Sequence, residues 1–177
     1  MPTYKPMSLY LETDRLTLRP WTASDVDDCH ALVSERDHRA RRHERGDGMP
    51  TVENIRGRIA TQLAATARTG IALLPVRRRI EGDFIGYCAR IVGRATVEEP
   101  EIAYELLRRA HGYGYATEAA GAVLDAAAAT GRSRLWSTVS SWNAPSFRVL
   151  HKLGFERHHV STDGDGAELV WLTRVLP

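Results

Sequence analysis

The sequence has few of the features that mark secreted, membrane-spanning or metal-binding chains. Its 177 residues include two cysteines, Cys29 and Cys88, far apart and without C-x-x-C spacing. We therefore expect both thiols to be reduced, as in a cytoplasmic protein. No apolar run approaches the ~18 residues of a membrane-spanning helix, and residues 1–10 lack the pattern of a signal peptide. These absences favour a soluble, cytoplasmic protein with no membrane partner.

Charge is also nearly balanced. The formal net charge of +2 at pH 7 is too small to argue for a nucleic-acid partner. Two neighbouring histidines, His158 and His159, are expected to point to opposite sides of a strand and have no third ligand nearby, so we expect no metal. What remains is an ordinary globular composition, 43% hydrophobic and 26% charged, in a chain long enough for one core.

The hydrophobic pattern predicts strands alternating with helices. Predicted strands cover 14–20, two segments within 71–92 joined by a turn at 81–83, and then 101–107, 134–141 and 167–176. Predicted helices cover 22–35 with Ser24 as N-cap, 51–68, an alanine-rich run before Gly131, and 144–153. This order favours a single α/β or α+β domain over residues 1–177, built on one mixed sheet.

Two glycines stand immediately before the alanine-rich helix, in HGYGYATEAAGAVL. At Gly112 and Gly114 the backbone can turn so that several N–H groups point at one spot, where the helix dipole adds about half a positive charge. Such a turn can bind a phosphate without a lysine, or it can simply connect a strand to a helix. A dinucleotide-binding G-x-G-x-x-G would need glycine where Thr117 stands, and no P-loop G-K-[ST] is present.

A second motif, NAPSFRVLHKLGF, predicts a short, well-capped helix. Asn143 is its expected N-cap, Pro145 lies in the first turn and Gly154 follows the end. Capping explains these residues without any function. Ser146 is different, because its first-turn hydroxyl can either satisfy a backbone group or take part in chemistry.

Together, TDRLTLRP, EIAYELLRRAHGYGYATEA and NAPSFRVLHKLGF resemble the GNAT N-acetyltransferases, in the branch that contains RimJ and RimL. The resemblance extends from about Thr13 to the last predicted strand. It implies a mixed, mostly antiparallel central sheet flanked by helices. It also implies transfer of an acetyl group from acetyl-CoA to a primary amine, on a protein N-terminus or a small molecule, without a metal. Dimers are common among similar proteins, so a homodimer is compatible with it.

The same resemblance assigns residues to the cofactor. Amides from His111 to Thr117 would hold the pyrophosphate, the strand at 106–108 would pair with the pantetheine arm, and Asn143 would flank the thiol. The full expected set is Leu106, Leu107, Arg108, His111, Gly112, Tyr113, Gly114, Tyr115, Ala116, Thr117, Asn143 and Arg148. His111 and Tyr113 depart from the aromatic, Arg or Gln and the Lys or Arg common in the family. Phosphate binding would then depend on Arg108, Arg109 or Arg148.

Catalytic roles follow from what acyl transfer needs. An alkyl amine has a pKa near 10 and must lose a proton before it attacks. The resemblance gives this task to Glu101, directly or through water, with Glu105 on the same strand face as the alternative. Ser146 is expected to donate to the departing sulfur, because Leu150 stands where the wider superfamily often has a tyrosine acid.

Other expectations concern the acceptor and the competing functions. The arginine-rich segment from Arg36 to Arg45 is expected to line the acceptor mouth and favour an acceptor with a carboxylate, or else to be a solvated surface. A CoA-binding sensor that no longer catalyses is the main alternative function. An NAD(P)H-dependent oxidoreductase is a more distant one.

Overall fold

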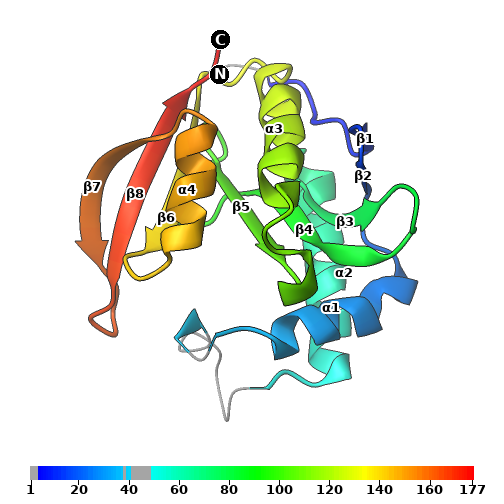
Figure 1. Ribbon diagram of the computed structural model, residues 1–177. Helices are drawn as coiled ribbons and strands as arrows, with labels where there is room; N and C mark the ends of the chain where they lie inside the picture. Colours follow the sequence, from blue (N-terminus) through cyan, green and yellow to red (C-terminus); the bar gives the residue numbers. More distant parts are fainter. Residues whose placement is uncertain (1–3, 38, 41–48) are drawn as a thin grey trace.

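A computed structural model describes residues 4–37, 39–40 and 49–177 (Figure 1). The first half contains β1 (Leu11–Glu12), β2 (Leu16–Leu18), η1 (Ala23–Asp25), α1 (Val26–Ser34), α2 (Val52–Thr69), β3 (Leu73–Arg78) and β4 (Phe84–Ile91). The second half contains β5 (Glu101–Leu106), η3 (Arg108–Ala110), α3 (Tyr115–Ala128), β6 (Arg134–Ser140), α4 (Ala144–Lys152), β7 (Glu156–Thr162) and β8 (Glu168–Val175). The predicted elements are all present, and the structure adds β1 and the full extent of β7.

The strands form one eight-stranded sheet in the order β1-β2-β3-β4-β5-β6-β8-β7. Its neighbouring strands are antiparallel except for β5 and β6, which are parallel. The mixed, mostly antiparallel sheet predicted from the sequence is therefore confirmed. Within this described sheet, β5 and β6 share a single register pair, Glu101 with Trp136, and then diverge. The sheet is thus split at its centre.

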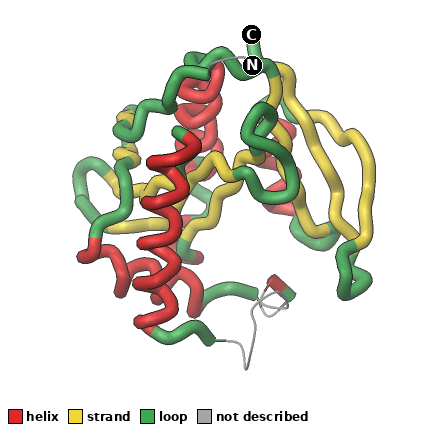
Figure 2. The backbone as a smooth tube through the Cα atoms, turned by 180° about the vertical axis from the view of Figure 1, so that it is seen from behind, coloured by secondary structure: helices red, strands yellow, loops and turns green. Residues whose placement is uncertain are grey.

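Helices cover both faces of the sheet. On one face α3 and α4 pack over a large core that includes Ile102, Leu135 and Leu150. The long helix α2 lies on the opposite face, as Figure 2 shows from behind. There Ile55 and Ile59 of α2 join a second core. Leu63, one turn after Ile59, is exposed, so the buried part of this helix face ends at Ile59.

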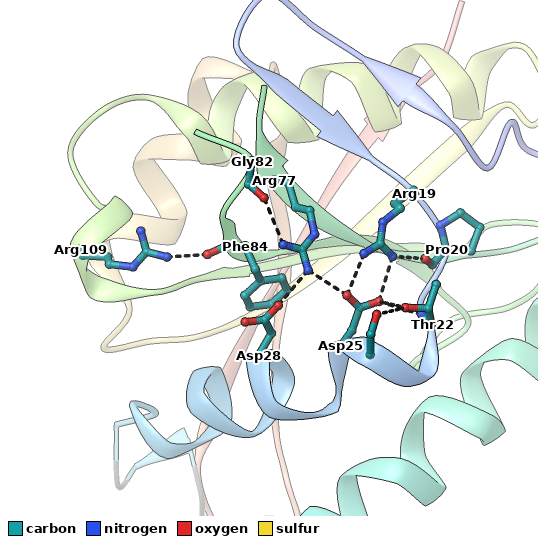
Figure 3. A network of polar contacts seen from close by, with 10 residues as sticks. Arg19, Pro20, Thr22, Asp25, Asp28, Arg77, Gly82, Phe84 and Arg109 are labelled. Atoms are coloured by element: carbon teal, nitrogen blue, oxygen red, sulfur yellow. Dashed lines mark hydrogen bonds and ion pairs between the residues drawn. The ribbon is translucent and has the colours of Figure 1, made fainter. Parts of the chain in front are cut away.

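The start of α1 differs from the prediction. Ser24 is not its N-cap: a 3₁₀ turn precedes the helix, Thr22 caps that turn, and α1 begins after Asp25. The buried carboxylate of Asp25 accepts hydrogen bonds from Arg19, Arg77 and the Thr22 amide (Figure 3). Burial raises the pKa of Asp25, but these donors outweigh burial and hold the pKa well below its ordinary value. This network ties α1 to β2 and β3.

The two adjacent histidines do not diverge as predicted. A register shift in β7 between Arg157 and His159 interrupts the regular alternation, and the Nδ1 atoms of His158 and His159 lie 2.8 Å apart. His159 stacks on Trp171 with ring centroids 5.0 Å apart, and His158 packs edge-on against Trp136. A β-bulge is a long-range pairing feature, so the alternation of sequence alone did not indicate it.

Candidate functional site

The split between β5 and β6 opens into a cavity of about 680 Å³. Its walls come from the end of β5, the turn before α3, the first turns of α4 and the residues that follow α1. Because β6 leaves β5 after one register pair, the carboxyl end of β5 faces this cavity instead of a neighbouring strand. The site is therefore a direct result of the sheet topology.

The predicted glycine turn forms one wall. Gly112 and Gly114 have φ of 84° and 81°, in the left-handed region that side chains with a Cβ avoid. Gly114 is the N-cap of α3. Across the described residues, the amides from 112 to 117 find no hydrogen-bond acceptor, so they are free to bind an anion. The turn has the chemistry of a phosphate cradle.

The segment before β2 fixes the position of this turn. Arg15 donates to the carbonyl of Tyr113 and forms an ion pair with Glu118 in the first turn of α3, and Thr13 donates to the same carboxylate. Burial raises the pKa of Glu118, but the hydrogen bonds from Thr13 and Arg15 dominate and lower it. The carboxylate therefore stays charged and holds the start of α3 against the N-terminal segment.

Most of the predicted cofactor residues line the cavity. They are Leu106, Arg108, His111, Gly112, Gly114, Tyr115, Ala116, Thr117, Asn143 and Arg148. Leu107 and Tyr113 do not line it. Leu107 is buried in the second core, and the Tyr113 side chain is 62% exposed and stacks on Tyr115. Only the backbone of these two residues is placed to contribute.

The three candidate arginines have different surroundings. Arg109 is not part of the cavity wall, and it forms an ion pair with Asp83. Its guanidinium also donates to the carbonyl of Phe84 (Figure 3). Arg108 lines the cavity, and Glu35 accepts from its amide and its guanidinium. Arg148 also lines the cavity, together with Lys152 one helical turn later, and neither contacts a carboxylate in the described part of the chain. Arg148 is thus the arginine best placed to bind a phosphate.

The two predicted catalytic residues lie in different places. Ser146 lines the cavity, and its amide donates to the Asn143 side chain that caps α4. Glu101 is 3% exposed and is not part of the cavity wall. Its carboxylate accepts from the Arg94 amide and from the Thr138 hydroxyl at 2.7 Å, so it joins a loop and β6 to the start of β5.

Glu105, the alternative base, does line the cavity. Arg36 binds its carboxylate through two guanidinium nitrogens, each at 2.8 Å from an oxygen. Tyr87 donates to the same carboxylate at 3.1 Å. Burial raises the pKa of Tyr87, so its hydroxyl remains a donor. Glu105 is therefore held in a fixed orientation at the edge of the cavity.

Part of the arginine-rich segment also reaches the cavity. Arg36 lines the wall, and Arg39 lies over the ring of Trp142 with 4.1 Å between guanidinium carbon and ring centroid. Trp142 precedes α4, so this contact joins the segment after α1 to the opposite wall. Arg41, Arg42 and Arg45 lie outside the described residues.

Sequence reasoning missed several residues of the wall. Tyr104, Trp142, Pro145, Val149 and Lys152 line the cavity without having been assigned to it. Tyr104 packs against the core on the face of β5 that it shares with Ile102. That core opens into the cavity where β5 and β6 separate, so hydrophobic alternation alone did not mark Tyr104 as a wall residue.

Neither cysteine is part of this wall. Burial raises the pKa of Cys29 to about 11 and that of Cys88 to about 12. Burial therefore favours the protonated form of both thiols near neutral pH. Across the described residues, no three His, Cys, Asp or Glu side chains gather as a metal site would require. The helices in that part of the chain are too short or too polar to cross a membrane.

Solved structures share this fold. A GNAT-family acetyltransferase from Bacillus anthracis is 22% identical, with 94% of this chain and 98% of that chain covered and a TM-score of 0.78. RimJ from Mycobacterium smegmatis, in complex with CoA-disulfide, is 24% identical over 90% of this chain and 81% of that chain, with a TM-score of 0.72. RimL, a ribosomal-protein acetyltransferase in complex with coenzyme A, is 15% identical over 97% of this chain and 98% of that chain, with a TM-score of 0.79.

Sequence comparison identifies the family itself. No curated protein matches the chain. The family model of the acetyltransferase (GNAT) domain, however, matches residues 15–156, which include the glycine turn and all of α4. The split sheet, the free amides before α3 and the cavity between them agree with that match. The chain belongs to the GNAT acetyltransferase family.

Proposed function

We propose that the protein is an acetyl-CoA-dependent N-acetyltransferase, formed as a single domain over residues 1–177 and acting in the cytoplasm. It would transfer the acetyl group from the CoA thioester to a primary amine, on a protein N-terminus or a small molecule. The observation that carries this proposal is the cavity at the sheet split. A phosphate cradle forms one wall of it, and Tyr104, Glu105 and Ser146 lie where the strands separate.

The residues of the cavity fit coenzyme A. The free amides from 112 to 117 would bind the pyrophosphate, and Arg148 with Lys152 would supply positive charge beside the phosphates. The backbone of β5 at the split would form hydrogen bonds with the pantetheine arm, in the way that a sheet edge pairs with an added strand. The thioester would then lie between β5 and the first turn of α4, close to Asn143 and Ser146.

We assign the general base to Glu105 in preference to Glu101. Both carboxylates are on the same face of β5, but Glu105 borders the cavity whereas Glu101 is enclosed by Arg94 and Thr138. Glu105 would accept the proton of the attacking amine on the side of the sheet where α1 lies. Glu101 remains the alternative if a water chain connects it to the amine.

The coenzyme complexes of RimL and RimJ support acetyl-CoA as the donor, because both proteins share this fold. The acceptor substrates in the names of these two proteins are not assigned to this chain. A sensor that binds CoA without catalysis is the second candidate. The retained pair of Ser146 and Glu105 at the split favours the enzyme, because a sensor has no need of them.

The decisive experiment is a screen of small amines and peptides with free N-termini, followed by thiol release from acetyl-CoA and by calorimetric CoA binding. Thiol release that depends on an amine is the expected result. CoA binding without release for any amine would favour the sensor, and absence of CoA binding would contradict both.

Glu105→Gln should lower kcat about 10²-fold or more, and Glu101→Gln much less. The reverse order would return the base to Glu101.

A further inference from the structure

We infer that the hydroxyl of Tyr104, and not that of Ser146, donates the hydrogen bond to the departing sulfur of coenzyme A, with Ser146 supporting Tyr104. This inference rests on the proposed function and assigns a further catalytic residue to the same site. It changes the role of Ser146 from direct donor to positioning residue.

The first argument is the position of Tyr104 on β5. The cavity wall includes Tyr104, Glu105 and Leu106 of this strand, so Tyr104 is the member closest to the point where β5 and β6 still pair. Consecutive strand residues point to opposite faces of a sheet. Glu105 faces α1 through its contact with Arg36, and Tyr104 faces α4 through its contact with Ser146. Glu105 and Tyr104 thus lie on opposite faces of the sheet, and a thioester bound at the split would have the base on one side and the sulfur donor on the other.

The second argument is the direction of the hydrogen bonds. Ser146 Oγ donates to Tyr104 Oη at 3.3 Å, and Tyr104 Oη donates to the backbone carbonyl of Ser146 at 3.1 Å. The proton of Ser146 is therefore already directed at the phenol oxygen. Tyr104 can turn its own hydrogen toward a sulfur by rotation about one C–O bond, while Ser146 continues to donate to it. Hydrogen bonds in such a chain strengthen one another.

The third argument is the protonation state. Burial raises the pKa of Tyr104 to about 12, although the Ser146 hydrogen bond lowers it in part. The phenol therefore stays neutral across the working pH range and stabilises the thiolate without giving up its proton. In the step itself the amine nitrogen forms a bond to the carbonyl carbon of the thioester, the C–S bond breaks and its electron pair goes to sulfur. The amine proton goes to Glu105, and the released thiolate takes a proton from solvent.

The test measures the thiol pKa of bound coenzyme A from the ultraviolet absorbance of its thiolate, with the desulfo analogue as blank. A hydrogen bond to a charged group should lower this pKa by about one unit or more in the wild type. Tyr104→Phe should abolish that shift, and Ser146→Ala should reduce it in part. Tyr10→Phe is the matched control, because Tyr10 is 73% exposed and remote from the cavity wall.

Kinetics provide the second readout. Tyr104→Phe should lower kcat about 10- to 100-fold at unchanged acetyl-CoA KM, and the Tyr104→Phe, Ser146→Ala double variant should be little worse. Additive losses, or a larger effect of Ser146→Ala on the thiol pKa, would overturn the inference. If Tyr104→Phe does not fold, 3-fluorotyrosine can replace Tyr104. Because the fluorinated phenol is a stronger hydrogen-bond donor, it should lower the pKa of the bound thiol further. An unchanged thiol pKa would contradict the inference. A thiol shift without any amine-dependent turnover would contradict the proposed function alone.

Discussion

Individual residues determine what the phosphate cradle can bind. Gly112 and Gly114 adopt left-handed conformations before α3, which leaves the amides of the turn free and unshielded. Under the proposed function, Arg148 would add the positive charge that the turn lacks, since Tyr113 occupies the position where a cation is common in the family. The two features would supply backbone and side-chain contacts to the same group of phosphates, and each can be removed separately.

Gly114→Val should weaken CoA binding at least 10-fold, because a side chain at φ of 81° strains the turn whose amides would bind the phosphates. Its Cβ would also lie 3.5 Å from the Arg15 guanidinium, which holds this turn in place. Gly131→Val is the matched control. Gly131 has φ of 83° but lies outside the cavity wall, so its variant carries similar strain without the contact. Calorimetry below the melting temperature checks this. Equal CoA affinity in the two variants would contradict the cradle.

Arg148→Gln should weaken CoA binding about 10-fold, because one charge-assisted contact to a phosphate is lost. Binding of pantetheine, which carries no phosphate, should not change. Arg68→Gln, at the exposed end of α2, is the control. If pantetheine affinity falls as much as CoA affinity, Arg148 acts on the arm and not on the phosphates.

Among the elements, α1 is held in position by a buried charge. Its N-cap is Asp25, whose carboxylate is fully buried and is held by Arg19 and Arg77. The segment after α1 carries Arg36 to the cavity, so the anchoring of α1 also positions the group that holds Glu105. Asp28 contacts the same Arg77 from a more exposed position.

Asp25→Asn should cost about 3–5 kcal/mol of unfolding free energy, because two arginines lose a buried partner, whereas Asp28→Asn should cost about 1 kcal/mol or less. The folded-state pKa of Asp25 lies below its ordinary value, so its contribution is present above about pH 4 and is lost as the pH falls further. Urea unfolding from about pH 5 to about pH 2 should show a shallower decline in Asp25→Asn. Parallel pH profiles would contradict this assignment.

How far the sequence predicted these elements depends on how local each signal is. The glycine turn and the Asn143 cap are local, and both were predicted correctly. A strand was expected at His158 and His159, but the extent of β7 was missed because nearly all its residues are exposed, so no buried face imposes an alternating pattern. Glu101 and Glu105 alternate identically in sequence. Only the register with β6 shows which of these two carboxylates borders the cavity. The same register shows that Tyr104 borders it as well.

The whole molecule should be more stable with its ligand than without it. A ligand that binds only the folded state adds about 2.7 kcal/mol at 100 times its Kd. For a chain of this length each kcal/mol raises Tm by roughly 2–4 °C, so saturating CoA should raise Tm by roughly 5–10 °C. Gly114→Val, with at least 10-fold weaker affinity, should show about half of this increase or less, and Gly131→Val the full one. A thermal shift that is identical in all three proteins would indicate binding elsewhere.

The separation of β5 from β6 has a consequence for the protein before it meets any ligand. Past Glu101 the inner side of β5 has no neighbouring strand in the described sheet, so its peptide groups form an edge in the middle of the molecule. Unpaired edges recruit strands from other chains. Freshly made protein that lacks coenzyme should therefore self-associate slowly, and light scattering should rise in apo samples and stay flat with CoA. Coenzyme would then protect against aggregation as well as serve as acetyl donor.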